Sequence, residues 1–331
     1  MIMRCFVDVF RMGKSTYEAI SKIHSNKQYI LLCMACNGES KYILGGKVKM
    51  GEEKINRNVP TLDQVKNIAE TIREVYKKPV IKMGIVEGEP SLLESKIGGT
   101  PYIPHEGQMP RDSQGVQMKL VAQIDCASIR GLEDFPKKGL LQFFVATDEM
   151  IGLDFKDLAS GKGSKVIYYE TFDQTVTEEE VLGKIEPLGA DRCFPIGGSY
   201  PIVFFVREEE MGLCDYRYDE LFIREYNAQF KENSISSIYD LDDAIVDEIC
   251  ASQDEFGHKI GGYPGFTQTD PRMYDTALQA YDTLLLQIDS ESDYKKYDIM
   301  WGDTGICNFF IRFSDLKNLD FSKVLYYWDC Y

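Results

Sequence analysis

Apolar positions at helical spacing mark a segment that begins near residue 61. They are Leu62, Val65, Ile68, Ala69, Ile72 and Val75. Residues three and four apart share one face of a helix, so this spacing predicts an amphipathic helix over 61–78. Thr61 is a suitable N-cap, Gln64 completes a capping box, and Pro79 ends the segment.

Shorter apolar runs bounded by glycine, proline or charged residues predict strands. Such runs lie at 4–10, 28–34 and 41–47, and a further run at 202–206 is expected to be a buried strand. A second helical pattern covers 239–251, with Leu241, Ala244, Ile245 and Ile249 on one face. Residues 1–80 are therefore expected to form a small basic α+β segment.

Four short blocks of sequence occur twice, in the same order. The pairs are 96–101 with 259–264, 121–126 with 285–290, 139–145 with 305–311, and 165–169 with 323–327. Such self-similarity indicates an internal repeat. The blocks are apolar, and the turns between them contain glycine, so they predict strands joined in antiparallel pairs.

The repeat sets the predicted fold class, which is α+β and rich in β-structure. We expect mostly antiparallel sheets built from an internal duplication, with pseudo-two-fold halves at 96–172 and 259–331 and a few peripheral helices. Segment 173–258 connects the halves, and the repeat region belongs to one domain over 81–331. Phe143, Phe144, Phe309 and Phe310 are assigned to the core because aromatic residues in such runs are mostly buried.

Charge is concentrated in the connecting segment. The 331 residues include 53 acidic and 37 basic side chains, for a net charge of −16, and residues 173–258 hold 21 of the acidic and 6 of the basic ones. This balance argues against nucleic-acid binding, which needs clustered lysine and arginine. It leaves two interpretations open: a surface that attracts a basic protein partner, or solvated helices that keep the chain soluble.

The sequence predicts a cytoplasmic protein that does not cross a membrane. No apolar run approaches the roughly 20 residues of a membrane helix, and residues 1–10 lack the features of a signal peptide. The nine cysteines are scattered, which is typical of reduced thiols.

Familiar catalytic and metal-binding patterns do not emerge, so whether the chain is an enzyme stays open. His24, His105 and His258 have no neighbours that identify a triad. The pair Cys33 and Cys36 lacks the second pair that a zinc site needs, and the glycine–lysine run at 161–165 lacks phosphate-loop spacing. We therefore expect no metal and no cofactor.

Seven polar or aromatic residues are candidates for lining a cleft. They are Gln123, Asp125, Arg272, Gln287, Asp289, Trp301 and Asp303. In each Gln-x-Asp pair both side chains lie on the same side of a strand, so the pairs of the two halves are expected to meet where the halves join. Arg272 offers a fork for a carboxylate or phosphate. The alternative is that the aspartates cap turns, Arg272 pairs locally and Trp301 packs in the core.

Several motifs resemble the YwqG-like family, bacterial proteins of unknown function. They lie at 95–104, in the Gln-Ile-Asp and Phe-Phe strands, and at 266–272, 300–305 and 326–330. The resemblance extends from about residue 80 to the C-terminus. It implies a β-rich mixed fold, a bacterial cytoplasmic location and a loose association with toxin cassettes, and it brings no catalytic residues.

Two functions follow as hypotheses. The first is a non-enzymatic binding or interaction protein, for example an immunity-type protein whose acidic face covers a basic toxin domain. The alternative is a binder or hydrolase of a small molecule in the cleft between the repeat halves, with Asp125, Asp289 or Asp303 as general base or metal ligand.

Overall fold

The computed structural model describes residues 60–187, 189, 192–250, 255–293 and 296–331. The chain divides into two compact units, 1–55 and 56–331, and the described residues belong to the second. Several predictions lie outside the described residues: the strands at 4–10, 28–34 and 41–47, His24, and the pair Cys33 and Cys36.

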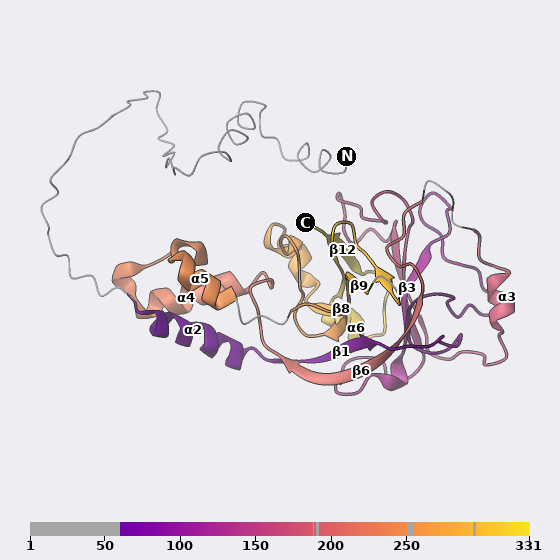
Figure 1. Ribbon diagram of the computed structural model, residues 1–331, viewed down its shortest axis with the longest axis horizontal. Helices are drawn as coiled ribbons and strands as arrows, with labels where there is room; N and C mark the ends of the chain where they lie inside the picture. The colour runs from indigo at the N-terminus through magenta and orange to yellow at the C-terminus, as the bar shows by residue number, and fades with distance from the viewer. Residues whose placement is uncertain (1–59, 188, 190–191, 251–254, 294–295) are drawn as a thin grey trace, which may run out of the picture. The chain divides into compact units, whose positions relative to one another are not determined.

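Helix α2 (Leu62–Val75) begins at the predicted capping box. The Gln64 N–H donates to Thr61 Oγ1 (3.3 Å), and the Thr61 N–H donates to Gln64 Oε1 (2.9 Å). The helix ends earlier than predicted because Lys78 already belongs to strand β1 (Lys78–Ile85). Its buried face, which includes Ile68 and Ile72, packs on two later helices, α4 (Tyr218–Gln229) and α5 (Asp243–Cys250) (Figure 1).

Ten strands form one antiparallel sheet in the order β12-β11-β8-β7-β1-β6-β2-β3-β4-β5. Besides β1, they are β2 (Lys96–Gly98), β3 (Lys119–Asp125), β4 (Leu140–Val145), β5 (Ser164–Tyr169), β6 (Ser199–Glu209), β7 (Lys259–Gly261), β8 (Thr283–Asp289), β11 (Ile306–Ile311) and β12 (Leu325–Asp329). A separate two-stranded sheet pairs β9 (Glu291–Ser292) with β10 (Asp298–Ile299). The β-rich fold, its antiparallel pairing and the strands of the repeated blocks are confirmed.

Short helices complete the described chain. They are α3 (Glu178–Leu182), α6 (Phe313–Lys317) and the 3-10 turns η3 (Cys126–Ser128), η4 (Lys231–Asn233), η5 (Ile238–Asp240), η6 (Pro271–Met273) and η7 (Leu278–Ala280). The helix predicted over 239–251 is confirmed only in part, because η5 and α5 are separate. Asp242 separates them: its carboxylate accepts the Ala244 N–H (3.0 Å) and so starts α5 as a new helix.

Strand β6 lies at the centre of the sheet but is less buried than predicted. It pairs with β1 from Ile202 opposite Ile85 to Glu209 opposite Lys78. The strand predicted at 202–206 is confirmed, but its predicted burial is wrong, because Phe205 and Val206 are 46% and 50% exposed. An apolar run predicts a strand, whereas its burial depends on which elements cover each face.

Four strands lie on either side of the central β1–β6 pair. Strands β2 to β5 continue from β6, and β7, β8, β11 and β12 continue from β1. The register shifts within β3 between Leu120 and Ala122, and opposite Phe309 and Phe310 the partner β8 shifts from Leu286 to Leu284. One hydrophobic cluster contains residues from both groups. All four phenylalanines assigned to the core are fully buried.

Candidate functional site

The side chain of Gln123 is buried, and backbone groups use its hydrogen-bonding capacity. Its Oε1 accepts the Tyr102 N–H (2.8 Å), and its Nε2 donates to the carbonyls of Leu92 (2.8 Å) and Glu94 (3.0 Å). The neighbouring Gln142 donates from Nε2 to the same Oε1 (2.8 Å). This network attaches the loops on either side of β2 to the sheet.

Gln287 makes the corresponding contacts on β8. It is also buried: its Oε1 accepts the Gly265 N–H (2.7 Å), and its Nε2 donates to the carbonyls of Glu255 (2.8 Å) and Gly257 (2.9 Å). Asn308 donates to the Gly265 carbonyl (2.8 Å). Each of the two glutamines thus attaches loop backbone to its strand, but the two have no hydrogen-bond partner in common.

Asp125 and Asp289 are half-buried and bond to backbone amides close by. The Asp125 carboxylate accepts the Ala127 N–H (3.0 Å) and caps η3. The Asp289 carboxylate accepts the N–H groups of Gly257 and Ser290, both at 2.7 Å. Each aspartate therefore stabilises the end of its strand.

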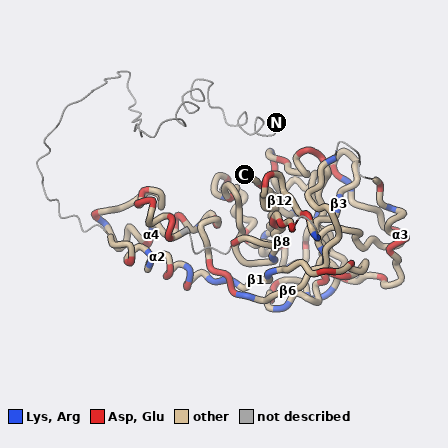
Figure 2. Tube along the Cα trace, viewed as in Figure 1, with Lys and Arg blue, Asp and Glu red and all other residues tan. Residues whose placement is uncertain are grey.

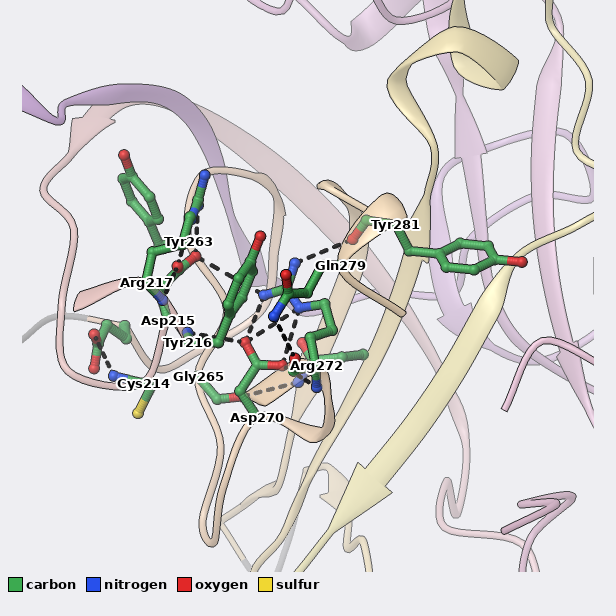
Figure 3. A network of polar contacts seen from close by, with 12 residues as sticks. Cys214, Asp215, Tyr216, Arg217, Tyr263, Gly265, Asp270, Arg272, Gln279 and Tyr281 are labelled. Carbon is green, nitrogen blue, oxygen red and sulfur yellow. Dashed lines mark hydrogen bonds and ion pairs between the residues drawn. The ribbon is translucent and has the colours of Figure 1, made fainter. Parts of the chain in front are cut away.

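Arg272 is buried in an ion-pair network on η6 (Figure 3). Its guanidinium donates to the Asp270 carboxylate, with the shortest contact at 2.6 Å from Nη2, and Nη1 donates to the Tyr281 carbonyl (3.1 Å). The guanidinium lies 4.9 Å from the ring centroid of Tyr216 and 4.3 Å from that of Phe310. Its fork is occupied by Asp270.

Trp301 and Asp303 differ in burial. The Trp301 ring is fully buried and lies 6.2 Å from the ring of Trp328. Asp303 is exposed, and its backbone carbonyl accepts the Tyr331 N–H (3.2 Å). In the strand order four strands separate β3 from β8. The predicted shared cleft stays a prediction; the two cavities described next are lined by other residues.

A cavity of about 510 Å³ adjoins the central strands, and we name it the central cavity. Its lining residues come from α2, β1, β6, the segment just after β6 and the segment just before β7. They are Arg73, Lys82, Arg207, Glu208, Glu209, Glu210, Met211, Gly212, Glu255 and Phe256.

A buried ion pair lies beside the central cavity. Lys259 is fully buried, and its Nζ donates to Glu209 Oε1 (2.8 Å) and to the Glu255 carbonyl (2.7 Å). Glu209 also contacts Lys82 Nζ (3.0 Å) and accepts the Tyr263 N–H (2.6 Å). Burial lowers the pKa of Lys259 to about 8 and raises the pKa of the Glu255 carboxyl.

Lys96, the first residue of β2, occupies a similar environment. It is buried, and its Nζ donates to the carbonyls of Ser91 (2.8 Å) and Leu92 (3.0 Å). Burial lowers its pKa to about 8 as well. Both lysines begin a Lys-Ile-Gly-Gly motif, which is the sequence signal that could have identified them.

The second cavity, of about 460 Å³, lies among α2, α4 and α5, and we name it the acidic groove. Its apolar lining residues are Pro60, Val65, Tyr226, Ile235, Leu241 and Ile245, and its polar ones are Glu232, Asn233, Ser234, Asp240 and Asp242. The three carboxylates are exposed. The backbone N–H groups of Ser236 and Ser237 donate hydrogen bonds to the Asp240 carboxylate and lower its pKa. This side chain is therefore charged at neutral pH.

Two properties of the described residues concern metal ions and membrane-spanning helices. Among them, no group of three or more histidine, cysteine, aspartate or glutamate side chains is placed to hold a metal ion. Within the same part of the chain, no helix combines the length and the apolar character needed to cross a bilayer.

The described part of the chain thus has a β-rich fold, and the central cavity and the acidic groove are its candidate binding sites. The family model described as "Domain of unknown function (DUF1963)" matches residues 95–330, and the chain belongs to this family. No curated protein matches it.

Proposed function

We propose that the chain is a binding protein that holds a basic, partly apolar segment of another protein in the acidic groove. The observation that carries this proposal is the lining of the groove, which combines an apolar floor with three exposed carboxylates and contains no lysine or arginine. Figure 2 shows further acidic positions in this part of the chain, around α4.

The groove has the properties expected of a peptide site. Val65 and Tyr226 are buried at its floor, and Ile235, Leu241 and Ile245 are half-buried, so a bound apolar side chain would remove apolar surface from water. The volume falls within the range typical of ligand sites. Carboxylates at the rim favour lysine or arginine beside that apolar side chain, and they speed association at low ionic strength.

The proposal is tested with three labelled peptides of equal length and the purified full chain. One alternates lysine with leucine, one alternates glutamate with leucine, and one alternates lysine with glycine. Fluorescence anisotropy is expected to show binding of the lysine–leucine peptide, weakened by added salt, and much weaker binding of the other two. If the lysine–glycine peptide bound as tightly as the lysine–leucine peptide, the apolar floor would contribute nothing to affinity, and the proposal would be contradicted.

Two double variants locate the site. Glu232→Gln with Asp242→Asn removes two charges from the groove, and Asn remains a good N-cap for α5. This variant is expected to weaken binding about fivefold. Glu178→Gln with Glu179→Gln removes the same charge from exposed positions of α3 and serves as the control. An equal loss of affinity in both variants would mean that the overall negative charge of the protein determines binding and that the groove is not the site.

We also infer that the two groups of four strands arose by duplication and that the chain is a YwqG-like protein. Three correspondences support the duplication. Strands β3 and β8 have a β-bulge at the same position. Lys96 and Lys259 are both buried, and Gln123 and Gln287 make equivalent hydrogen bonds to backbone groups. The motifs that resemble the YwqG-like family all lie within the segment matched by the family model, 95–330.

A further inference from the structure

Two arginines line the central cavity from different elements. Arg73 of α2 is half-buried, and its Nη2 donates to the Ile249 carbonyl (2.8 Å). Arg207 of β6 is exposed, and its Nη1 donates to the Val206 carbonyl (2.9 Å). Neither forms an ion pair with any carboxylate among the described residues. Since a guanidinium has five N–H donors, each arginine keeps most of its donors for a ligand.

Most carboxylates around the cavity have other partners. Glu209 is held by Lys259, by Lys82 and by a backbone N–H. Glu210 lies 3.6 Å from Lys77 Nζ. Glu208, the residue after Arg207 on β6, also lines the cavity.

Glu255 is buried and is held by a backbone N–H group. Its Oε1 accepts the Cys214 N–H (3.2 Å), and burial raises the pKa of its carboxyl. Glu209, Glu210 and Glu255 thus already have partners. The two arginines remain without a carboxylate partner among the described residues.

We propose that the central cavity binds a small oxyanion, a carboxylate or phosphate group, through the guanidinium groups of Arg73 and Arg207. Arginine forks match both groups because they donate two parallel hydrogen bonds. Lys82 also lines the cavity, but its Nζ already contacts Glu209 (3.0 Å) and the Phe256 carbonyl (3.1 Å). Met211 and the partly exposed ring of Phe256 provide apolar contacts for the rest of the ligand.

This site is separate from the acidic groove, since the two cavities have no lining residue in common. Each proposal can therefore fail without the other.

The test is isothermal titration of the full chain with two probes, inorganic phosphate and succinate, at constant ionic strength set with chloride. Saturable binding of either probe supports the site, and the tighter probe identifies the preferred group. The absence of saturable binding for both probes would overturn the proposal.

Variants then locate the bound anion. The single variant Arg207→Gln and the double variant Arg73→Gln with Arg207→Gln are both expected to weaken anion binding about tenfold or more. Each substitution removes a charge-assisted hydrogen bond to the anion. Arg224→Gln is the control: it removes an equal charge from an exposed arginine on α4 that pairs with Glu225. Binding that survives loss of both arginines would overturn the proposal. The groove variant Glu232→Gln with Asp242→Asn is expected to keep the anion response.

Discussion

Phe143 of β4 and Phe309 of β11 contact each other edge to face, with ring centroids 5.2 Å apart. Both rings are fully buried in the same hydrophobic cluster. The two strands are not neighbours in the sheet, since six others lie between them in the strand order. This contact therefore joins the two groups of four strands through their side chains, in addition to the hydrogen bonds of the central pair.

The Phe143–Phe309 contact predicts energetic coupling between the groups. Phe143→Leu and Phe309→Leu are each expected to lower the free energy of unfolding by about 1–2 kcal/mol. The double variant is expected to deviate from additivity by about 0.5–1.5 kcal/mol. Urea denaturation measures these values.

Phe222→Leu provides the matched control, because Phe222 belongs to a different cluster, beneath α4. Combined with Phe143→Leu it is expected to be additive. Additivity of the Phe143–Phe309 pair as well would show that the contact does not couple the two groups.

Gln123 and Gln287 are expected to matter for stability. Gln123→Met removes the partner of the Tyr102 N–H and of the Glu94 carbonyl, whereas the Leu92 carbonyl keeps the Lys96 ammonium as a donor. The free energy of unfolding is therefore expected to fall by about 1–3 kcal/mol. Gln287→Met is expected to behave alike, and Gln114→Met, at an exposed position, to change little. Wild-type stability in the first two variants would favour the cleft hypothesis instead.

The buried lysines predict a dependence of stability on pH. The pKa of Lys96 is about 8 in the folded chain against a usual value of 10.5. Between these values the unfolded chain binds a proton that the folded chain has released, so the free energy of unfolding rises with pH. The rise amounts to about 3 kcal/mol for this lysine, and below pH 8 both states hold the proton and the dependence disappears.

The measurement compares urea denaturation of wild type and Lys96→Met from pH 7 to 10.5. The stability of the variant relative to wild type is expected to decline as pH increases above 8, because only wild type gains from deprotonation. Lys156→Met, at an exposed position, is expected to follow wild type throughout. Parallel curves for wild type and Lys96→Met would contradict the lowered pKa.

Asp270 and Arg272 are expected to act as a structural pair. Asp270→Ala leaves a buried guanidinium whose nearest other carboxylate, that of Asp215, is 3.8 Å away. The expected loss is about 3–5 kcal/mol of unfolding free energy. Arg272→Lys also destabilises, because an ammonium replaces neither the fork nor the stacking on Tyr216.

The control for this pair is Arg224→Lys, at an exposed position, which is expected to be neutral. Retention of wild-type stability by Arg272→Lys would return Arg272 to the list of candidate ligand-binding residues.

Local features of the fold could be predicted from sequence, and long-range ones could not. The capping box at Thr61 and the strands of the repeated blocks depend on residues close together in the chain. The Glu209–Lys259 pair joins residues 50 positions apart. A charged residue in a sequence is normally expected to be exposed, so the burial of Lys259 was not predicted. The repeated Lys-Ile-Gly-Gly motif is the feature that sets Lys96 and Lys259 apart in the sequence.

The two cavities were missed for the same physical reason. The central cavity unites Arg73, Lys82 and Arg207, and the acidic groove unites Val65 with residues beyond 225. Each set is assembled only when helix α2 and strand β1, which are adjacent in sequence, dock against later elements. Composition did indicate an acidic segment at 173–258, but it did not show where a partner could bind.

Strand β1 connects the halves of the sheet, yet it lies outside the segment matched by the family model, 95–330. A shortened protein that starts at residue 95 would lose the strand between β7 and β6, leaving five strands on one side and four on the other with new unpaired edges. Exposed edges of this kind promote aggregation. The shortened protein would therefore contain two half-sheets that no strand joins by hydrogen bonds, whereas a protein that starts near residue 56 would keep the sheet continuous.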